Sequence, residues 1–258
     1  MKRMIRHIIE PERLFLAWQA PDGTSHDRTR RKVAEITPDD SGIVTLRYLK
    51  DSEDFVKACL AGFTGYPAFP LGQDQYASGI LETFMRRLPP IKRRDYHDFM
   101  RLWRLDPAIP ISSLAMLGYV GAQLPGDGFS LVHPFDNGKP PFELLEEVAG
   151  FRYRENFGQI LALLHEGQEI QLRAEPDNPH DPKAIRVELP DNRLIGYINK
   201  LQAPGLHKWL PNQNVRCTVD RINGTETRPL VYVFLEVGVN DKCTDHSCNS
   251  CESPQDTP

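Results

Sequence analysis

Short runs of strict alternation between hydrophobic and polar residues fill the second half of the chain, and they restrict its possible folds most strongly. In one run, Ile170, Leu172 and Ala174 alternate with polar residues. A period of two is typical of a β-strand with one buried face. Such alternating or apolar runs cover residues 170–174, 185–189, 194–198, 215–220 and 230–239. Turn-forming residues separate them, which predicts a small β-barrel or sandwich, with one short helix over 201–210.

The first half of the chain predicts strands and helices together. Hydrophobic runs predict strands at residues 14–18, 32–36 and 43–49, and helices are predicted at 80–88 and 95–105. The acidic and serine residues at 51–54 predict a short capped helix or a turn at 55–60. The segment 132–141 is rich in Pro, Gly and Asn and is interpreted as a linker. We therefore expect an α+β protein, with a mixed N-terminal domain over 1–140 and a compact β-rich domain over 145–240.

Charge and hydropathy exclude two classes of protein. The chain has 31 Lys and Arg against 35 Asp and Glu, so a globally basic nucleic-acid binder is excluded and any anionic partner must meet a local patch. The longest uncharged stretch, 107–126, contains three prolines and two serines, which argues against a membrane span. The N-terminus has no apolar signal core, so we expect a cytoplasmic protein.

The segment Glu175-Pro-Asp-Asn-Pro-His-Asp-Pro-Lys-Ala-Ile185 is the strongest local signal. By residue type it is a turn between two strands in which Asn178 and Asp181 hydrogen-bond the turn's own backbone. A second interpretation is a metal site formed by Asp177, His180 and Asp181. These residue types alone do not decide between the two.

The same segment resembles the HIRAN domain. The resemblance rests on Asn178-Pro-His-Asp-Pro-Lys-Ala-Ile185, on Ile195-Gly-Tyr197, on Gln202-Ala-Pro-Gly-Leu206, and on Val148-Ala-Gly-Phe-Arg-Tyr153 as the opening strand. It covers residues 147 to 240. It implies an OB-like β-barrel that binds single-stranded DNA and captures a free 3′-hydroxyl end.

The resemblance also implies which residues meet the nucleic acid. They are Arg152, Tyr153, Asn178, His180, Asp181, Tyr197 and Lys200. Arg152 and Lys200 would contact phosphate, Tyr153 would stack on a base, and Asn178 and Asp181 would accept the 3′-hydroxyl. His180 stands where the family usually has an aromatic residue. Stacking gives an affinity that tolerates any sequence, and a carboxylate distinguishes a hydroxyl end from a phosphate.

The barrel region itself has little positive charge. Residues 147–240 contain 11 Lys and Arg against 12 Asp and Glu, which predicts a shallow salt dependence of DNA binding. The first half contains a basic run with Arg86, Arg87, Lys92, Arg93 and Arg94. This run is either a solvated helix face or a patch that faces phosphate.

The first half also resembles, over shorter motifs, the N-terminal subdomain of HipA-type toxin kinases. The motifs are Phe84-Met-Arg-Arg-Leu-Pro89 and Met116-Leu-Gly-Tyr-Val-Gly-Ala-Gln-Leu-Pro-Gly-Asp127. The kinase half has no counterpart, so the resemblance implies a docking surface for a protein partner and no phosphotransfer. No phosphate-binding loop and no serine-hydrolase motif are present, and we do not expect an enzyme.

The last residues form a tail, 241–258, without aliphatic or aromatic side chains. Cys243, His246, Cys248 and Cys251 lie within nine residues. The tail is expected to be disordered and redox-sensitive, or to hold zinc through these four side chains.

Three functions follow from the sequence. The first is recognition of single-stranded DNA or 3′-hydroxyl ends, in DNA repair, replication-fork processing or defence. The second is a protein-interaction adaptor related to HipA N-terminal modules, without DNA binding. The third is a metal-dependent nuclease or hydrolase that uses Asp177, His180 and Asp181.

Overall fold

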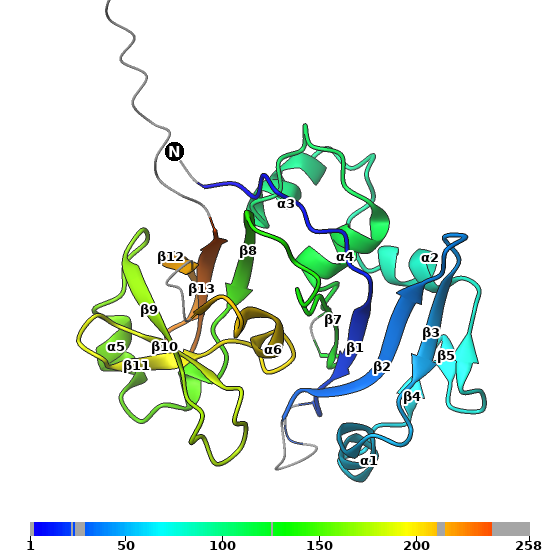
Figure 1. The fold of residues 1–258 in the computed structure, drawn as a ribbon, viewed down its shortest axis with the longest axis horizontal. Helices are drawn as coiled ribbons and strands as arrows, with labels where there is room; N and C mark the ends of the chain where they lie inside the picture. The colour runs from blue at the N-terminus through cyan, green and yellow to red at the C-terminus, as the bar shows by residue number, and fades with distance from the viewer. Residues whose placement is uncertain (1–2, 22, 24–28, 125, 211–214, 239–258) are drawn as a thin grey trace, which may run out of the picture.

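The computed structural model contains two large sheets that lie next to each other, with helices packed around and between them (Figure 1). It describes residues 3–21, 23, 29–124, 126–210 and 215–238. In this described part of the chain, no helix combines the length and the hydrophobicity that crossing a bilayer requires.

The N-terminal sheet has five strands in the order β6-β3-β2-β1-β7. Its strands are β1 (Leu14–Trp18), β2 (Arg31–Pro38), β3 (Val44–Tyr48), β6 (Gln75–Tyr76) and β7 (Phe129–Val132). Every residue of β1 is buried, because this strand lies inside the sheet and contacts both β2 and β7. The predicted strands at 14–18, 32–36 and 43–49 are confirmed. A small hairpin pairs β4 (Gly65–Tyr66) with β5 (Phe69–Pro70).

Four helices accompany this sheet. They are α1 (Glu53–Leu60), α2 (Ile80–Met85), α3 (Tyr96–Leu102) and α4 (Ser113–Val120). The hydroxyl of Ser52 caps α1 by accepting the N–H of Phe55 at 3.1 Å. Helix α4 was not predicted: seven of its eight residues are buried, so it has no polar face to show a helical period. Gly118 lets α4 approach the sheet, since a Cβ there would lie 2.9 Å from Leu14.

The C-terminal sheet has six antiparallel strands in the order β11-β10-β9-β12-β13-β8. They are β8 (Phe142–Glu147), β9 (Glu169–Ala174), β10 (Ile185–Glu188), β11 (Leu194–Tyr197), β12 (Val215–Thr225) and β13 (Arg228–Val237). The sheet curls into a half-barrel, and the edge strand β11 pairs with the second residue after β8: Ala149 and Tyr197 exchange two backbone hydrogen bonds of 2.8 and 2.9 Å. Gly196 permits this closure, because a Cβ there would lie 2.4 Å from the Ala149 oxygen. The α+β class with a small barrel-like C-terminal sheet is confirmed.

Two predictions for this region need correction. The opening strand is β8, and residues 148–153, predicted to be that strand, end in a 3-10 turn, η1 (Phe151–Tyr153). The predicted helix over 201–210 is reduced to α6 (Ala203–Leu206), flanked by turns. A further short helix, α5 (Phe157–Leu161), follows η1.

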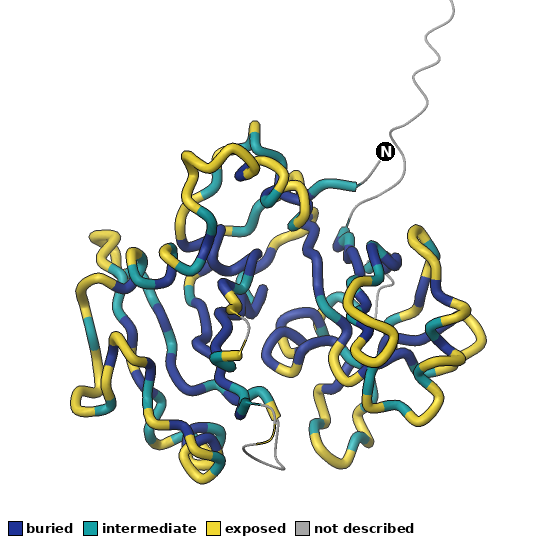
Figure 2. Tube along the Cα trace, turned by 180° about the vertical axis from the view of Figure 1, so that it is seen from behind, coloured by how far each residue is buried: buried dark blue, intermediate teal, exposed yellow. Residues whose placement is uncertain are grey.

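The segment interpreted as a linker is packed between the two sheets. His133 and Phe135 are 0% and 1% exposed, and the ring of Phe135 stacks on Phe142 at the start of β8. Helix α6 lies tightly against this segment, since a Cβ on Gly205 would come within 2.1 Å of the Pro134 oxygen. One continuous hydrophobic core therefore includes residues of both halves, as the buried trace in Figure 2 shows.

Candidate nucleic-acid interface

The turn between β9 and β10 is organised by the side chain of Asn178. Its Oδ1 accepts the backbone N–H groups of His180 and Asp181 at 2.9 and 3.1 Å. Asp181 continues the pattern, since its Oδ1 accepts the N–H of Lys183 at 2.9 Å. The prediction that Asn178 and Asp181 bond their own backbone is confirmed. The turn is thus held in shape by its own side chains, and the imidazole of His180 remains exposed.

Glu175 connects this turn to the neighbouring strands. It accepts hydrogen bonds from Asn178 Nδ2 at 2.6 Å and from Arg186 at 3.2 Å. The hydrogen bond from Asn178 lowers the pKa of the Glu175 carboxyl, and Tyr197 and Arg186 lower it further. Glu175 therefore carries a negative charge that fixes the amide of Asn178 and the ring of Tyr197 in place.

The η1 turn carries an exposed aromatic side chain with a basic side chain beside it. Tyr153 is 63% exposed, and the guanidinium of Arg152 lies 4.7 Å from its ring centre. The next residue, Arg154, lies over the ring of Tyr197 at 5.1 Å. Contacts thus run from Arg154, directly after η1, through Tyr197 and Glu175 to Asn178.

A groove of about 290 Å³ lies beside this turn, between the two halves of the chain. Asp181 and Lys200 line it from the C-terminal half, together with α6. Lys200 also forms an ion pair with Asp54 of α1 at 3.2 Å. Of the side chains predicted to meet the 3′-hydroxyl or a phosphate, Asp181 and Lys200 therefore line one concave site, whereas Asn178 and Arg152 do not line it.

The basic run of the first half is only partly available to a ligand. The side chain of Arg87 is 7% exposed and binds Asp127 through both terminal nitrogens, at 2.6 and 3.1 Å. It also donates to the carbonyl of Ala122, so it holds the core together and does not belong to a surface patch. The other four residues are exposed: Arg86, Lys92, Arg93 and Arg94. Arg93 pairs with Asp95 at 2.6 Å.

The predicted metal sites have different outcomes. Cys243, His246, Cys248 and Cys251, and with them the tail 241–258, lie outside the described residues. Across the residues that the structure does describe, no three His, Cys, Asp or Glu side chains come together as metal ligands. Asp177, His180 and Asp181 are therefore not brought together as a set of metal ligands.

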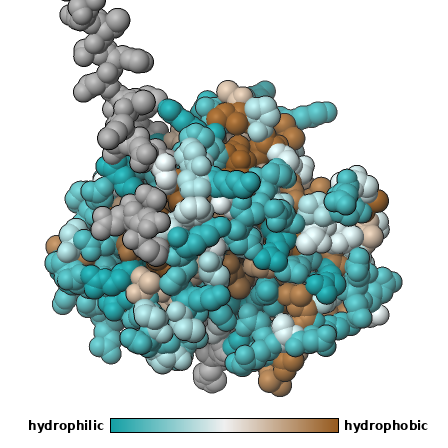
Figure 3. Space-filling model, viewed as in Figure 1, coloured by the Kyte–Doolittle hydropathy of each residue, from teal (hydrophilic) through white to brown (hydrophobic). Residues whose placement is uncertain are grey.

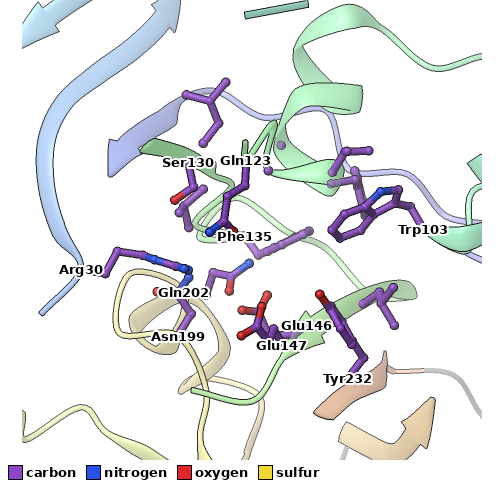
Figure 4. A pocket seen from close by; sticks show the side chains of 17 residues that line it. Arg30, Trp103, Gln123, Ser130, Phe135, Glu146, Glu147, Asn199, Gln202 and Tyr232 are labelled. Carbon is purple, nitrogen blue, oxygen red and sulfur yellow. The ribbon is translucent and has the colours of Figure 1, made fainter. Parts of the chain in front are cut away.

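A second cavity, of about 80 Å³, was not predicted (Figure 4). Glu146 and Glu147 of β8 lie at its centre, and Arg30, Asn199 and Gln202 point toward their carboxyl groups. Burial raises the pKa of Glu146 to about 8, and burial also raises the pKa of Glu147. In the sequence, this cavity is indicated only by the two adjacent acids, Glu146 and Glu147. Their carboxyl groups become buried because the two halves of the chain pack together.

Comparison with known protein families gives a match that covers the C-terminal half-barrel. Residues 143–238 match the HIRAN domain family, so the chain contains a HIRAN domain over this range. The match begins two residues before the predicted boundary at 145. It does not extend to the first half, where the resemblance to HipA stays a prediction. A HIRAN domain indicates DNA binding as the class of function.

Two solved structures are similar to part of this chain. The crystal structure of the HIRAN domain of human HLTF is 21% identical and covers 37% of this chain and 74% of that chain, with a TM-score of 0.30. A crystal structure of a protein from Lactobacillus plantarum is 25% identical and covers 36% of this chain and 91% of that chain, with a TM-score of 0.28. No curated protein matches this chain.

Proposed function

We propose that this protein binds single-stranded DNA and captures a free 3′-hydroxyl end through its HIRAN domain, in DNA repair, replication-fork processing or defence. The observation that carries the proposal is the self-supported turn at the groove. Asn178 fixes the turn through two backbone N–H groups, and the carboxylate of Asp181 lines the groove together with Lys200.

The chemistry of Asp181 suits a hydroxyl end. The N–H of Lys183 occupies one side of its Oδ1, and a carboxylate has lone pairs for further donors. A 3′-hydroxyl can donate to it, and charge assistance makes such a hydrogen bond strong. A 3′-phosphate would bring two negative groups together, so the site discriminates against it.

The exposed ring of Tyr153 provides a surface on which a base can stack. A stacked base contributes about 1–3 kcal/mol and tolerates any base identity, because every base has a π-face. Arg152, which lies beside this ring, would contact the phosphate of the same nucleotide. End capture by Asp181 and stacking on Tyr153 therefore require no particular sequence.

The experiment compares Asp181→Asn with the unchanged protein, using fluorescence anisotropy of a 5′-labelled single strand with a free 3′-hydroxyl. Loss of a charge-assisted hydrogen bond is expected to weaken binding about tenfold or more. The asparagine Oδ1 can still accept the N–H of Lys183, so the melting temperature should stay close to that of the unchanged protein.

Asp191→Asn is the matched control, since Asp191 also lies in a turn of this sheet and pairs with Arg193 away from the groove. It should bind like the unchanged protein. An Asp181→Asn protein that is folded and binds the strand with unaltered affinity would exclude the role proposed for Asp181.

The adaptor function rests on a different surface. Val56 and Leu60 of α1 are 49% and 84% exposed, and hydrophobic side chains gather over α1 and near α3 on an otherwise mostly hydrophilic face (Figure 3). Docking of a protein partner on α1 is the alternative function. Val56→Asp with Leu60→Asp would abolish such docking and leave DNA binding unchanged.

A further inference from the structure

The groove beside Asp181 has a second wall that the HIRAN domain does not supply. Arg13, Phe15 and Lys32 line it from the N-terminal sheet, opposite Asp181 and Lys200. Phe15 lies in β1 and Lys32 in β2, with Arg13 immediately before β1. Strands that precede the HIRAN domain by more than a hundred residues therefore form half of the site.

Hydrophobic contacts fix the base of this groove across the two halves. Phe15 and Leu201 are 7% and 8% exposed and belong to one small cluster with Ala17 and Val132. The cluster joins β1 and β7 to the segment that carries Lys200. The distance between the two walls is thus set by packing, as a preformed binding site requires.

Asp54 of α1 adds a polar connection between the walls. Its carboxylate pairs with Lys200 on one side at 3.2 Å, and it accepts the backbone N–H of Lys32 on the other at 3.3 Å. Arg31 pairs with the same carboxylate at 3.5 Å. One acid therefore holds the ammonium of Lys200 on one side and the backbone of Lys32 on the other.

The ammonium group of Lys32 is available to bind an anion. Its ammonium lies 4.3 Å from the ring centre of Phe15, and among the described residues it forms no ion pair with a carboxylate. Arg13, by contrast, already pairs with Asp136. Lys32 thus adds positive charge to the wall that faces Lys200.

We infer that Lys32, with Arg13 beside it, binds the phosphate backbone of the strand whose 3′ end lies at Asp181, so that the N-terminal half completes the DNA site. This inference rests on the proposed function. It accounts for the charge of the HIRAN domain, whose 11 basic and 12 acidic residues over 147–240 provide little attraction for a polyanion. A strand that leaves the end pocket along this groove meets cations from both halves.

The test replaces Lys32 by Gln, which removes the charge and keeps a stem that can lie on Phe15. Binding of a 5′-labelled oligothymidylate of about 12 nucleotides, a length within the usual range of OB-type sites, is measured against salt. Lys32→Gln should weaken binding about threefold to tenfold at low salt and reduce the salt slope by about one unit. Lys32→Arg keeps the charge and should restore both values.

Lys50→Ala is the control for the change in net charge. Lys50 follows β3 of the same sheet, pairs with Asp74, and does not line the groove. It should leave the salt slope unchanged. If Lys32→Gln behaves like Lys50→Ala while Asp181→Asn loses affinity, the N-terminal wall has no role and end capture stands. If the unchanged protein binds no strand at all, both proposals are wrong.

Discussion

Arg104 and Asp220 form a buried ion pair that joins the two halves of the chain: Nε of Arg104 lies 2.6 Å from Oδ1 of Asp220, and the side chains are 7% and 6% exposed. Arg104 follows α3 and Asp220 lies in β12. Arg221 adds to the contact by donating to the carbonyl of Leu102 at 2.7 Å. The HIRAN half-barrel is thus attached to the first half through charges that have little access to water.

Breaking this pair should destabilise the whole protein. Removing one partner of a buried pair costs about 3–5 kcal/mol, and the lower end of that range is expected here because Arg221 still pairs with the Asp220 carboxylate at 2.9 Å. Arg104→Ala is therefore expected to lower the free energy of unfolding in urea by that amount, in one transition, because the core is shared. Arg101→Ala, which removes an exposed arginine paired with Asp98, should change it little. Equal stabilities of the two variants would contradict the structural role of the pair.

The buried carboxyl of Glu146 should make stability depend on pH. Burial raises its pKa to about 8, against an ordinary value of 4.5, so the folded state holds a proton that the unfolded state releases between these values. Stability should therefore fall, by a few kcal/mol, as the pH rises from about 4.5 to 8. Glu147, whose pKa burial also raises, acts in the same direction.

Glu146→Gln tests this dependence, because the amide is neutral at every pH and has nearly the same shape. The variant should be more stable than the unchanged protein at pH 8, and its stability should vary less between pH 5 and 8, as seen in denaturant unfolding at several pH values. A variant with an undiminished pH dependence would show that Glu146 is not responsible.

Tyr153 should contribute to DNA binding through its ring and not through its hydroxyl. Tyr153→Ala is expected to weaken binding of single strands by about 1–3 kcal/mol, similarly for strands of different base composition. Tyr153→Phe keeps the stacking surface and should bind almost normally. Because Tyr153 is 63% exposed, neither change should lower the melting temperature appreciably. Equal losses in the two variants, measured by anisotropy, would exclude stacking.

The alternating runs predicted most of the C-terminal strands because each strand buries one face, and periodicity reports this directly. β8 was not predicted because it has no exposed face to produce alternation: its first five residues, Phe142 to Glu146, are all buried, including Glu143 and Glu146. Because acidic residues are rarely buried, a segment that contains several of them is expected to be exposed. The contacts that bury them come from residues far away in the chain.

In the candidate site, too, the local features were predicted and the features that depend on distant residues were not. The turn around Asn178 and Asp181 was predicted because Asx chemistry is local and reads directly from residue order. The burial of Arg87 and the groove wall at Lys32 depend on how two distant segments meet. Asp127, which binds Arg87, is forty residues further along the chain. No local pattern around Arg87 distinguishes such an arginine from one that faces solvent.

The most direct test of end capture compares one single strand that carries either a 3′-hydroxyl or a 3′-phosphate, with the unchanged full-length protein at one salt concentration. The carboxylate of Asp181 at the groove predicts at least about tenfold tighter binding of the hydroxyl end, the free energy of one charge-assisted hydrogen bond. Equal affinity for the two ends would contradict end capture, whatever the variants show.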